Sequence, residues 1–256
     1  MISKDSRKVV GEYVFLSKYS QTHNGVKETW DEAVNRVMTM HWNRYKEIVN
    51  EADMPEFERL FGFAEKLYHQ QHILGAQRAL QYGGELMLEK HARFYNCSST
   101  YIDRVEVFEE IMYLLLCGAG TGYSVQHIHT EQLPIPKGFN PKLEKKIFVI
   151  PDTIEGWAKA AGELIGAYYY GRAEVLFDYS QIRPKGAYIR GGFRAPGPEP
   201  LREALDKVRS LLCKVQKRKL RPFELHYIIC VLANSVVTGG VRRSAMIDRK
   251  STRLNS

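Results

Sequence analysis

The sequence predicts an α/β protein in which a mainly helical amino-terminal region precedes strands that alternate with helices. Apolar residues recur at helical spacing through much of residues 1–90, which predicts helices there. From residue 91 onward, short segments rich in β-branched and aromatic residues alternate with helical stretches. Because this alternation favours parallel pairing, we expect parallel strands in the second region. The composition, with 44% hydrophobic and 26% charged residues, is typical of a globular chain.

Two amino-terminal helices have recognisable starts. Thr29-Trp-Asp-Glu32 has the pattern of a capping box, in which a hydroxyl and a carboxylate each accept a hydrogen bond from a backbone amide. We therefore expect a helix from about residue 29 to 48. Asp53-Met-Pro-Glu56 repeats the pattern with a proline near the first helical position, which predicts a second helix up to about Gln70. Gly83-Gly84 interrupts the region that follows.

The second region is predicted to contain four strands. They are residues 94–99, 123–128, 146–150 and 173–179. Asp103-Arg-Val-Glu106 is predicted to open a helix that Gly118 closes, and Asp152-Thr-Ile-Glu155 is predicted to open another through a capping box. Residues 184–200, rich in Pro and Gly, are predicted to form an irregular loop. Two long helices complete the prediction, at about 199–218 and 222–237.

The charge balance and the start of the sequence narrow the class of protein. A formal charge of +8 favours polyanionic partners, for which nucleotide phosphates and nucleic acid both qualify. Much of the excess lies in Lys214-Val-Gln-Lys-Arg-Lys-Leu-Arg221 and after Ile247, and we interpret the first cluster as solvated helix ends, with no nucleic-acid partner. No apolar run reaches the roughly eighteen residues of a membrane span, and the start lacks the apolar stretch of a secretory signal. We expect a cytoplasmic protein without a membrane association.

The histidines and cysteines predict no metal centre. The four cysteines are widely spaced and lack a C-x-x-C pair, which argues against both a structural zinc and a disulfide scaffold. His127 and His129 are predicted to point to one face of a strand, and His69 and His72 to share a helix face. Neither pair has a third ligand close in the sequence, so we predict that the chain holds no metal.

Cys97 differs from the other cysteines in its sequence neighbours. It lies among polar residues in Tyr95-Asn-Cys-Ser-Ser-Thr100, whereas Cys117, Cys213 and Cys230 each follow an apolar run. Cysteines with apolar neighbours are mostly structural, so Cys97 is the candidate for redox chemistry.

Two glycine-containing motifs leave alternatives open. Gly118-Ala-Gly-Thr-Gly122 follows a predicted helix and therefore lacks the strand-then-helix order of a dinucleotide-binding loop. Its glycines suit either a ligand or close packing against a neighbouring strand. Gly239-Gly-Val-Arg-Arg-Ser244 lacks the Lys-Ser/Thr ending of a phosphate-binding loop, and its arginines suit either a phosphate clamp or ordinary ion pairs.

Several stretches together resemble the class II ribonucleotide reductases, in particular the branch that reduces ribonucleoside triphosphates. In family order they are Lys27-Glu-Thr-Trp30, Phe94-Tyr-Asn-Cys-Ser-Ser-Thr-Tyr-Ile-Asp103, Leu116-Cys-Gly-Ala-Gly-Thr-Gly-Tyr-Ser-Val-Gln126, Asp152-Thr-Ile-Glu-Gly-Trp157, Phe177-Asp-Tyr-Ser-Gln-Ile-Arg-Pro-Lys-Gly186, Gly191-Gly-Phe-Arg-Ala-Pro-Gly-Pro-Glu-Pro200 and Val237-Thr-Gly-Gly-Val-Arg-Arg-Ser-Ala-Met246. The resemblance implies a helical amino-terminal region over 1–90 and the first half of a ten-stranded α/β barrel over 91–247. Residues 248–256 form a tail that no longer resembles the family.

The resemblance also implies roles for individual residues. Cys97 matches a redox cysteine on the first barrel strand, whose thiol helps to expel the ribose 2′ hydroxyl as water after a thiyl radical has removed the 3′ hydrogen. That thiol then forms a disulfide with a second cysteine, which a hydroxyl could not do. Asp103 matches a contact to the effector ribose, although we favour a helix cap for it. The positions that match the surroundings of the substrate are Asn96, Ser98, Ala119 and Gly120. The resemblance implies structural roles near the active site for the stretch 191–200 and for Arg242-Arg243.

The implied activity is the reduction of ribonucleotides to deoxyribonucleotides, and the sequence leaves both di- and triphosphates open. The resemblance implies adenosylcobalamin as cofactor, a deoxynucleotide effector and thioredoxin as reductant, in a monomer or a homodimer. The thiyl cysteine, the redox partner of Cys97 and most cobalamin contacts are expected beyond Ile247, so the chain is expected to be incomplete and inactive alone. A reductase of another radical class and a nucleotide-binding module without chemistry are the alternatives. Half a barrel exposes a sheet edge and an apolar face, which predicts poor solubility.

Overall fold

The computed structural model describes residues 4–23, 25–189, 193–215 and 217–236. The chain divides into two compact units. The first comprises residues 1–95 and 189–193, and the second comprises residues 96–188 and 194–256.

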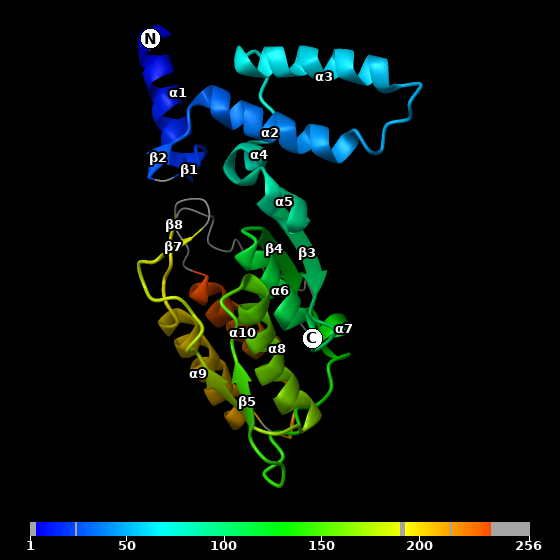
Figure 1. Ribbon diagram of the computed structural model, residues 1–256. Coiled ribbons are helices and arrows are strands. Elements are labelled where there is room, and N and C mark those ends of the chain that lie inside the picture. The colour runs from blue at the N-terminus through cyan, green and yellow to red at the C-terminus, as the bar shows by residue number, and fades with distance from the viewer. Residues whose placement is uncertain (1–3, 24, 190–192, 216, 237–256) are drawn as a thin grey trace. The chain divides into compact units, whose positions relative to one another are not determined.

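The first unit is helical apart from one short hairpin (Figure 1). Its helices are α1 (Lys4–Lys18), α2 (Trp30–Tyr45), α3 (Met54–His69), α4 (Gln77–Tyr82), α5 (Glu85–Glu89) and the 3-10 helix η1 (His91–Phe94). Strands β1 (Thr22–His23) and β2 (Val26–Lys27) pair antiparallel next to Gly25, whose φ of +84° suits a tight turn. The predicted helical character of this region and the break at Gly83-Gly84, between α4 and α5, are confirmed.

The two predicted helix starts of the first unit have different outcomes. The Thr29 hydroxyl accepts a hydrogen bond from the Glu32 N–H at 3.3 Å, and the Glu32 carboxylate accepts one from the Thr29 N–H at 2.7 Å, which confirms the capping box of α2. Helix α3 begins where predicted, but the Asp53 side chain makes no capping bond. Asp53 has helical backbone angles, φ −94° and ψ −9°, instead of the extended ones from which a cap side chain reaches back to the amides.

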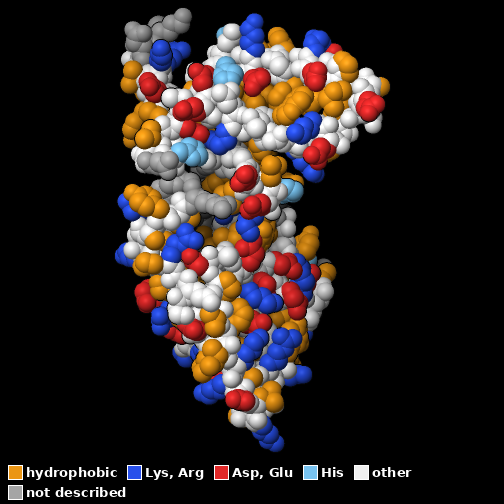
Figure 2. All heavy atoms as spheres, viewed as in Figure 1, with side chains coloured by type: hydrophobic (Ala, Val, Ile, Leu, Met, Phe, Trp, Pro, Cys, Tyr) orange, Lys and Arg blue, Asp and Glu red, His pale blue; other side chains and the backbone are white. Residues whose placement is uncertain are grey.

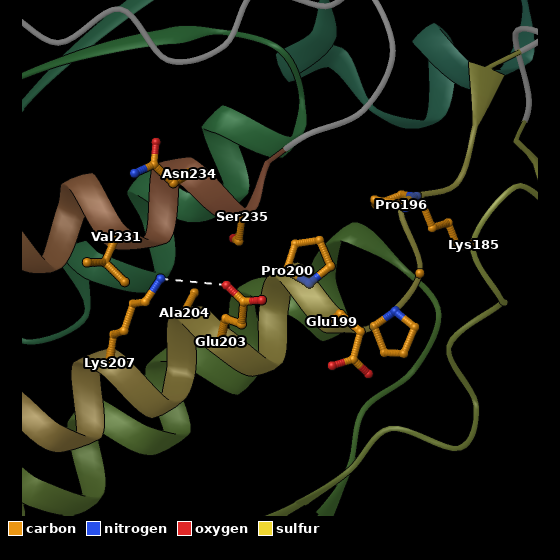
Figure 3. Close-up of a pocket in the computed structure, with 12 residues that line it drawn as sticks. Lys185, Pro196, Glu199, Pro200, Glu203, Ala204, Lys207, Val231, Asn234 and Ser235 are labelled. Carbon is orange, nitrogen blue, oxygen red and sulfur yellow. Dashed lines mark ion pairs between the residues drawn. The ribbon is translucent and has the colours of Figure 1, made fainter.

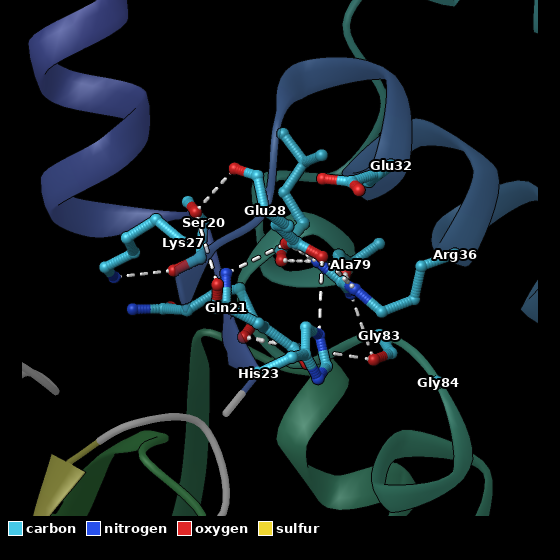
Figure 4. Close-up of polar contacts among 12 residues, drawn as sticks. Ser20, Gln21, His23, Lys27, Glu28, Glu32, Arg36, Ala79, Gly83 and Gly84 are labelled. Carbon is cyan, nitrogen blue, oxygen red and sulfur yellow. Dashed lines mark hydrogen bonds and ion pairs between the residues drawn. The ribbon is translucent and has the colours of Figure 1, made fainter. Parts of the chain in front are cut away.

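A buried ion pair joins the hairpin, α2 and the end of α4 (Figure 4). The Glu28 side chain is 3% exposed and accepts hydrogen bonds from Arg36 Nε at 3.0 Å and from the Gln21 N–H at 2.8 Å. Arg36 also donates to three backbone carbonyls at the end of α4, those of Ala79, Leu80 and Gly83. One charged pair therefore satisfies the last carbonyls of a six-residue helix and anchors the hairpin.

Two pairs of parallel strands form most of the β-structure in the second unit (Figure 1). The pairs are β3 (Cys97–Tyr101) with β4 (Gly120–Ser124), and β5 (Lys146–Val149) with β6 (Val175–Asp178). The predicted parallel pairing is confirmed. Among the described residues the two pairs form separate sheets, and β7 (Tyr188–Ile189) pairs with β8 (Phe193–Arg194) in a third.

Helices of the second unit pack together into its core. They are α6 (Val107–Leu116), α8 (Ile154–Tyr170), α9 (Glu199–Lys214) and α10 (Pro222–Ser235), whereas the short helix α7 (His127–Thr130) follows β4. Helix α8 packs against both α6 and α9, and α10 also packs against α6 and α9. Side chains such as Phe108, Leu164 and Ile229 are 0% exposed, so this cluster excludes water. Gly162 lets α8 approach α6 closely, because a Cβ there would lie 2.0 Å from Glu109 Oε2.

Several predicted boundaries in the second unit are wrong. The first strand begins at Cys97 because residues 91–94 form η1, and the second runs from Gly120 to Ser124 because the glycine-rich turn itself becomes extended. The predicted strand over 123–128 is therefore incorrect, and His127 and His129 lie on the short helix α7. Helix α6 begins at Val107, four residues later than predicted.

The remaining predictions for this unit are confirmed in part. Helix α8 has Thr153 as its N-cap, with its hydroxyl accepting from the Gly156 N–H at 3.0 Å, so the cap lies one residue after the predicted Asp152 and Gly156 has no side chain to complete a capping box. The stretch 184–200 is more regular than predicted: the Gly186 N–H donates to the Ala195 carbonyl at 2.8 Å beside the β7–β8 pair. The two long final helices are confirmed, as α9 and α10.

Candidate active site

Strand β3 exposes Cys97 at its first position. Exposed and half-buried side chains alternate along β3, as expected for a strand with one face open to solvent, so Cys97, Ser99 and Tyr101 share the exposed face. Cys97 lies in register with Gly120 of β4, and the Gly120 N–H donates to the Asn96 carbonyl at 2.8 Å. The thiol is therefore solvent-accessible and directly beside the glycine-rich segment, as the redox interpretation requires.

The glycine-rich segment Gly118–Gly122 lies next to this thiol. Gly118 has a φ of +84°, and its N–H donates to the Leu115 carbonyl, which ends α6 and turns the chain into β4. Ala119 is 1% exposed and Gly120 is buried, so a ligand would meet backbone here more than side chain. Packing against β3, one of the two alternatives left by the sequence, is thus what the structure shows for this buried segment, and contact with a ligand stays a prediction.

The structure brings some of the predicted site residues together on one face and separates others. Asn96 is exposed immediately before Cys97, Gly120 lies opposite Cys97 on β4, and the buried Ala119 directly precedes that strand. Ser98 lies on the other face of the sheet, where its hydroxyl is 3.0 Å from the Thr121 hydroxyl. Only the backbone of Ser98 is therefore shared with the Cys97 face.

Asp103 does not cap α6, so that interpretation is wrong. The N-cap of α6 is Glu106, and the Asp103 carboxylate accepts a hydrogen bond from Arg104 Nη1 at 2.7 Å. Arg104 also pairs with Glu110 on the first turn of α6. A chain of charges thus occupies the loop after β3, and the Asp103 side chain remains 27% exposed.

The other three cysteines have different surroundings. None of the four cysteines, all in the described part of the chain, is in a disulfide. Cys117 is buried, whereas Cys213 is exposed, although its thiol lies 2.7 Å from the hydroxyl of the buried Tyr168. Helix α9 is amphipathic, so Cys213 faces solvent while the adjacent Leu212 is buried. Burial raises the pKa of the Cys230 thiol, which lies 3.3 Å from His226 Nε2.

Sequence reasoning missed an aromatic pair on the Cys97 face. The ring of Tyr101 stacks on that of His129 from α7, with 4.3 Å between ring centroids and 30° between ring planes. The Tyr101 side chain is 55% exposed. The period of two along a strand would have placed Tyr101 with Cys97, but no local pattern could reveal that His129 returns to it.

A separate cavity of about 400 Å³ lies where the start of α9 meets the end of α10 (Figure 3). Glu203 and Lys207 on α9 form an ion pair of 3.6 Å at its wall, and the proline-rich turn at 196–200 closes one side. Its Ser235 hydroxyl donates to the Leu232 carbonyl at 2.6 Å. Part of the 191–200 motif therefore builds a turn against two helices, which agrees with its predicted structural role.

Charge on the second unit is mixed. Figure 2 shows Lys and Arg side chains interspersed with Asp and Glu on the visible face. In the basic stretch before α10, Arg218 pairs with Glu224 at 2.6 Å, and Lys219 donates to the Glu131 carbonyl. The part of the chain that the structure describes contains no group of three or more His, Cys, Asp or Glu placed to hold a metal ion. Among the described helices, none is long and apolar enough to cross a membrane.

Some sequence predictions fall outside the described residues. They concern the Gly-Gly pair at 191–192, the motif at 239–244 with Arg242 and Arg243, and the tail at 248–256.

Comparison with known proteins finds similarity to B12-dependent ribonucleotide reductases. A family model described as the insertion domain of B12-dependent ribonucleotide reductase matches residues 136–212. The adenosylcobalamin-dependent ribonucleoside-triphosphate reductase of Euglena gracilis is 27% identical, over 93% of this chain and 34% of its own length. A probable enzyme of the same name from Dictyostelium discoideum is also 27% identical, over 93% of this chain and 35% of its own length.

A solved structure supports the fold. The crystal structure of a B12-dependent (class II) ribonucleotide reductase superimposes with a TM-score of 0.73 at 21% identity, covering 92% of this chain and 41% of that chain. The family model covers β5, α8, β6 and most of α9, which matches the separation of β5–β6 from β3–β4. The chain spans about a third of the length of the curated relatives it matches. These matches agree with the family expected from the motifs: the chain is similar to the amino-terminal part of class II, B12-dependent ribonucleotide reductases.

Proposed function

We propose that this chain is part of an enzyme that reduces ribonucleoside triphosphates to 2′-deoxyribonucleoside triphosphates by thiyl-radical chemistry, and that Cys97 is one of the two thiols that reduce the ribose. The observation that carries the proposal is the placement of Cys97. Its thiol is exposed at the first residue of β3, opposite the side-chain-free Gly120 on the parallel neighbour. The names of the relatives supply the substrate class and the reductase activity.

The proposed step balances with two thiols. The ribose C2′–O bond breaks and a C2′–H bond forms, which takes two electrons and two protons from the thiols. The hydroxyl leaves as water, and one S–S bond forms between Cys97 and a second cysteine that we place outside this chain. Cys97 would donate the proton to the departing hydroxyl, since an exposed thiol can act as a general acid and then enter a disulfide. The 3′ hydrogen is removed and returned by a separate thiyl radical, so it does not alter this balance.

The neighbours of Cys97 would hold the sugar. The Asn96 side chain is exposed beside the thiol, and the backbones of Ser98, Ala119 and Gly120 let the sugar approach without a side chain in the way. Because the Gly120 N–H is already bonded to the Asn96 carbonyl, Gly120 would contribute space instead of a hydrogen bond. We further propose that Asp103, 27% exposed in the loop after β3, contacts the ribose of a deoxynucleotide effector.

Adenosylcobalamin would supply the radical when bound. The β3–β4 pair presents one open face on which Cys97, Ser99 and Tyr101 are exposed, and two paired strands do not enclose a corrinoid. We therefore assign no cobalamin contact to the described residues and place those contacts in the rest of the enzyme. The same proposal includes thioredoxin as the reductant, a monomeric or homodimeric enzyme, a cytoplasmic location and a domain boundary near residue 90. The boundary is supported by the division between the two units after Tyr95.

The test uses a full-length protein that carries this chain. Turnover should depend on adenosylcobalamin, and Cys97→Ser should lower multiple turnover by at least about a hundredfold, the usual scale for losing an acid group in the transition state. Cys213→Ser is the matched control, because Cys213 is also exposed but lies on α9, and its turnover should match the wild type. Unchanged product yield in Cys97→Ser would favour a nucleotide-binding module, and turnover without the cofactor would favour another radical class.

A further inference from the structure

The exposed face of β3 ends in an aromatic surface. Tyr101 is four residues after Cys97, so both side chains project from the same face, about 13 Å apart along the strand. His129 covers one face of the Tyr101 ring at 4.3 Å between centroids, yet the Tyr101 side chain is still 55% exposed. One face of the ring is therefore held by a neighbour while the rest is open to solvent.

The position of α7 determines which ring face is covered. Helix α7 follows β4 by two residues, and because β3 and β4 are parallel it begins beyond the carboxyl ends of both strands, as Figure 1 shows. His129 therefore approaches Tyr101 from the carboxyl side of the sheet. The part of the ring that His129 leaves uncovered is accessible from the face of β3 that also carries Cys97.

The residues between the thiol and the ring are small. Ser99 and Gly122 lie between them on the same face of the pair, and a Cβ built on Gly122 would meet only the Ser98 carbonyl oxygen, at 3.7 Å. A reacting sugar atom lies about 3–3.5 Å from its catalytic group. A stacked aromatic pair has centroids about 4.5–7 Å apart. Together these two distances account for most of the roughly 13 Å between Cys97 and Tyr101 along β3. The few ångströms that remain correspond to the separation between a ribose carbon and the base attached to the same sugar.

We propose that Tyr101, held in place by His129, is the surface on which the base of the substrate nucleotide stacks, and that this contact positions the ribose at Cys97. This inference rests on the proposed function. Tyr101 acts as a positioning residue, since it touches the base and not the reacting atoms. Stacking accepts any base, because every base has a π face, so this contact would hold purine and pyrimidine ribonucleotides alike.

The test compares a nucleotide with its base-free analogue. Binding of CTP and of ribose 5-triphosphate is measured by calorimetry on the full-length protein without cofactor, for the wild type, Tyr101→Leu and Tyr101→Phe. Tyr101→Leu should weaken CTP binding about tenfold, within the range measured for loss of one base–aromatic stack. Tyr101→Phe keeps the ring and should bind CTP within about twofold of the wild type. All three proteins should bind ribose 5-triphosphate equally, because that ligand has no base. Tyr13→Leu is the matched control, since Tyr13 is 71% exposed on α1, and it should bind both ligands as the wild type does.

The outcomes separate this inference from the proposed function. If Tyr101→Leu binds CTP as tightly as the wild type while Cys97→Ser still abolishes turnover, the stacking role is wrong and the proposed function stands. Equal loss of CTP and ribose 5-triphosphate in Tyr101→Leu would also overturn stacking, because it would indicate damage to the whole site. A wild-type protein that binds neither ligand would overturn both.

Discussion

Glu28 carries a buried charge that depends on one partner. Its side chain is 3% exposed, and that of Arg36 is 15% exposed. Removing only one member of such a pair leaves the other charge in a poorly solvated place, which costs more than the pair itself contributes. Arg36 also holds the end of α4, so the effect of losing Glu28 extends to a neighbouring helix.

We predict that Glu28→Ala lowers the free energy of unfolding by about 3 kcal/mol, the lower part of the range for breaking a buried pair. The measurement is urea unfolding of the 256-residue chain, followed by circular dichroism. Glu56→Ala is the control: its pair with Arg59 has side chains 60% and 65% exposed, so its unfolding midpoint should match the wild type. Equal unfolding midpoints for all three proteins would show that the Glu28–Arg36 pair does not stabilise the fold.

Single residues were predictable from the sequence where their local neighbours decide their environment. Cys97 has polar neighbours on a strand, as predicted, and its side chain is exposed. Cys213 follows two leucines, yet it is exposed, because the face of an amphipathic helix changes with each residue. The stacking of His129 on Tyr101 joins two elements distant in sequence, and no local pattern encodes it.

Helix caps act at the scale of the element, and two of them form a matched pair. The Thr153 hydroxyl accepts from the Gly156 N–H at the start of α8, whereas Asp53 makes no side-chain cap bond at the start of α3. We predict that Thr153→Ala lowers the free energy of unfolding by about 1 kcal/mol, the usual loss for an N-cap. Asp53→Ala should change it by much less. Urea unfolding measures both, and an equal loss in the two variants would contradict the assigned caps.

The start of α10 depends on the ionisation of Glu224. Hydrogen bonds from Arg218, from the Arg221 backbone and from the Arg221 side chain lower the pKa of Glu224 to about 2 against the opposing effect of burial. An unfolded Glu has a pKa of about 4.3. Because the folded pKa is the lower one, the stabilisation is complete above about pH 5 and is lost as the pH falls toward 2.

We predict that acidification from pH 6 to pH 3 destabilises the wild type by about 1 kcal/mol more than Glu224→Gln, a value reduced for the solvent exposure of the two arginines. Urea unfolding at intervals of pH provides the comparison. Glu199→Gln, at an exposed carboxylate on the first turn of α9, should retain the wild-type pH dependence. If Glu224→Gln also keeps the wild-type slope, the carboxylate does not stabilise α10.

Element types were predictable, but several boundaries were not. Periodic apolar residues and caps located the long helices, including α2, α8 and α9. The second strand was misplaced because Gly120 and Gly122 have no side-chain pattern to mark them as extended, and pairing with β3 makes them so. Tertiary pairing therefore decided a segment whose local preference was weak.

At the scale of the whole molecule, the β5–β6 pair has an uncovered apolar face. Ile147 is 69% exposed and Leu176, its partner in register, is 41% exposed, while Phe148 and Phe177 pack against the core from the opposite face. An exposed apolar face on a short sheet favours association between molecules.

We predict that the 256-residue chain self-associates with increasing concentration and that Ile147→Lys reduces this association. Light scattering after size-exclusion chromatography measures the mass at each concentration. Ile48→Lys is the control, because Ile48 is 58% exposed in the first unit and far in sequence from this sheet. A monodisperse wild type at all concentrations would contradict the prediction of poor solubility.

The global fold was predictable because the motifs occur in one order along the chain. The alternation of strands and helices predicted the parallel pairing that the structure shows. The resemblance predicted a fold that a solved class II ribonucleotide reductase shares. The sequence did not reveal that the described strands form separate pairs, since the register between distant strands depends on contacts that no local pattern records.

In the proposed reaction, Cys97 is oxidised when the ribose is reduced. The most direct measurement is a single turnover of the pre-reduced full-length protein without external reductant, followed by alkylation and mass spectrometry of every cysteine. We predict that the amount of Cys97 found in a disulfide equals the amount of deoxynucleotide formed, while the Cys213 thiol is still alkylated. Product formation with Cys97 fully alkylated afterwards would contradict it.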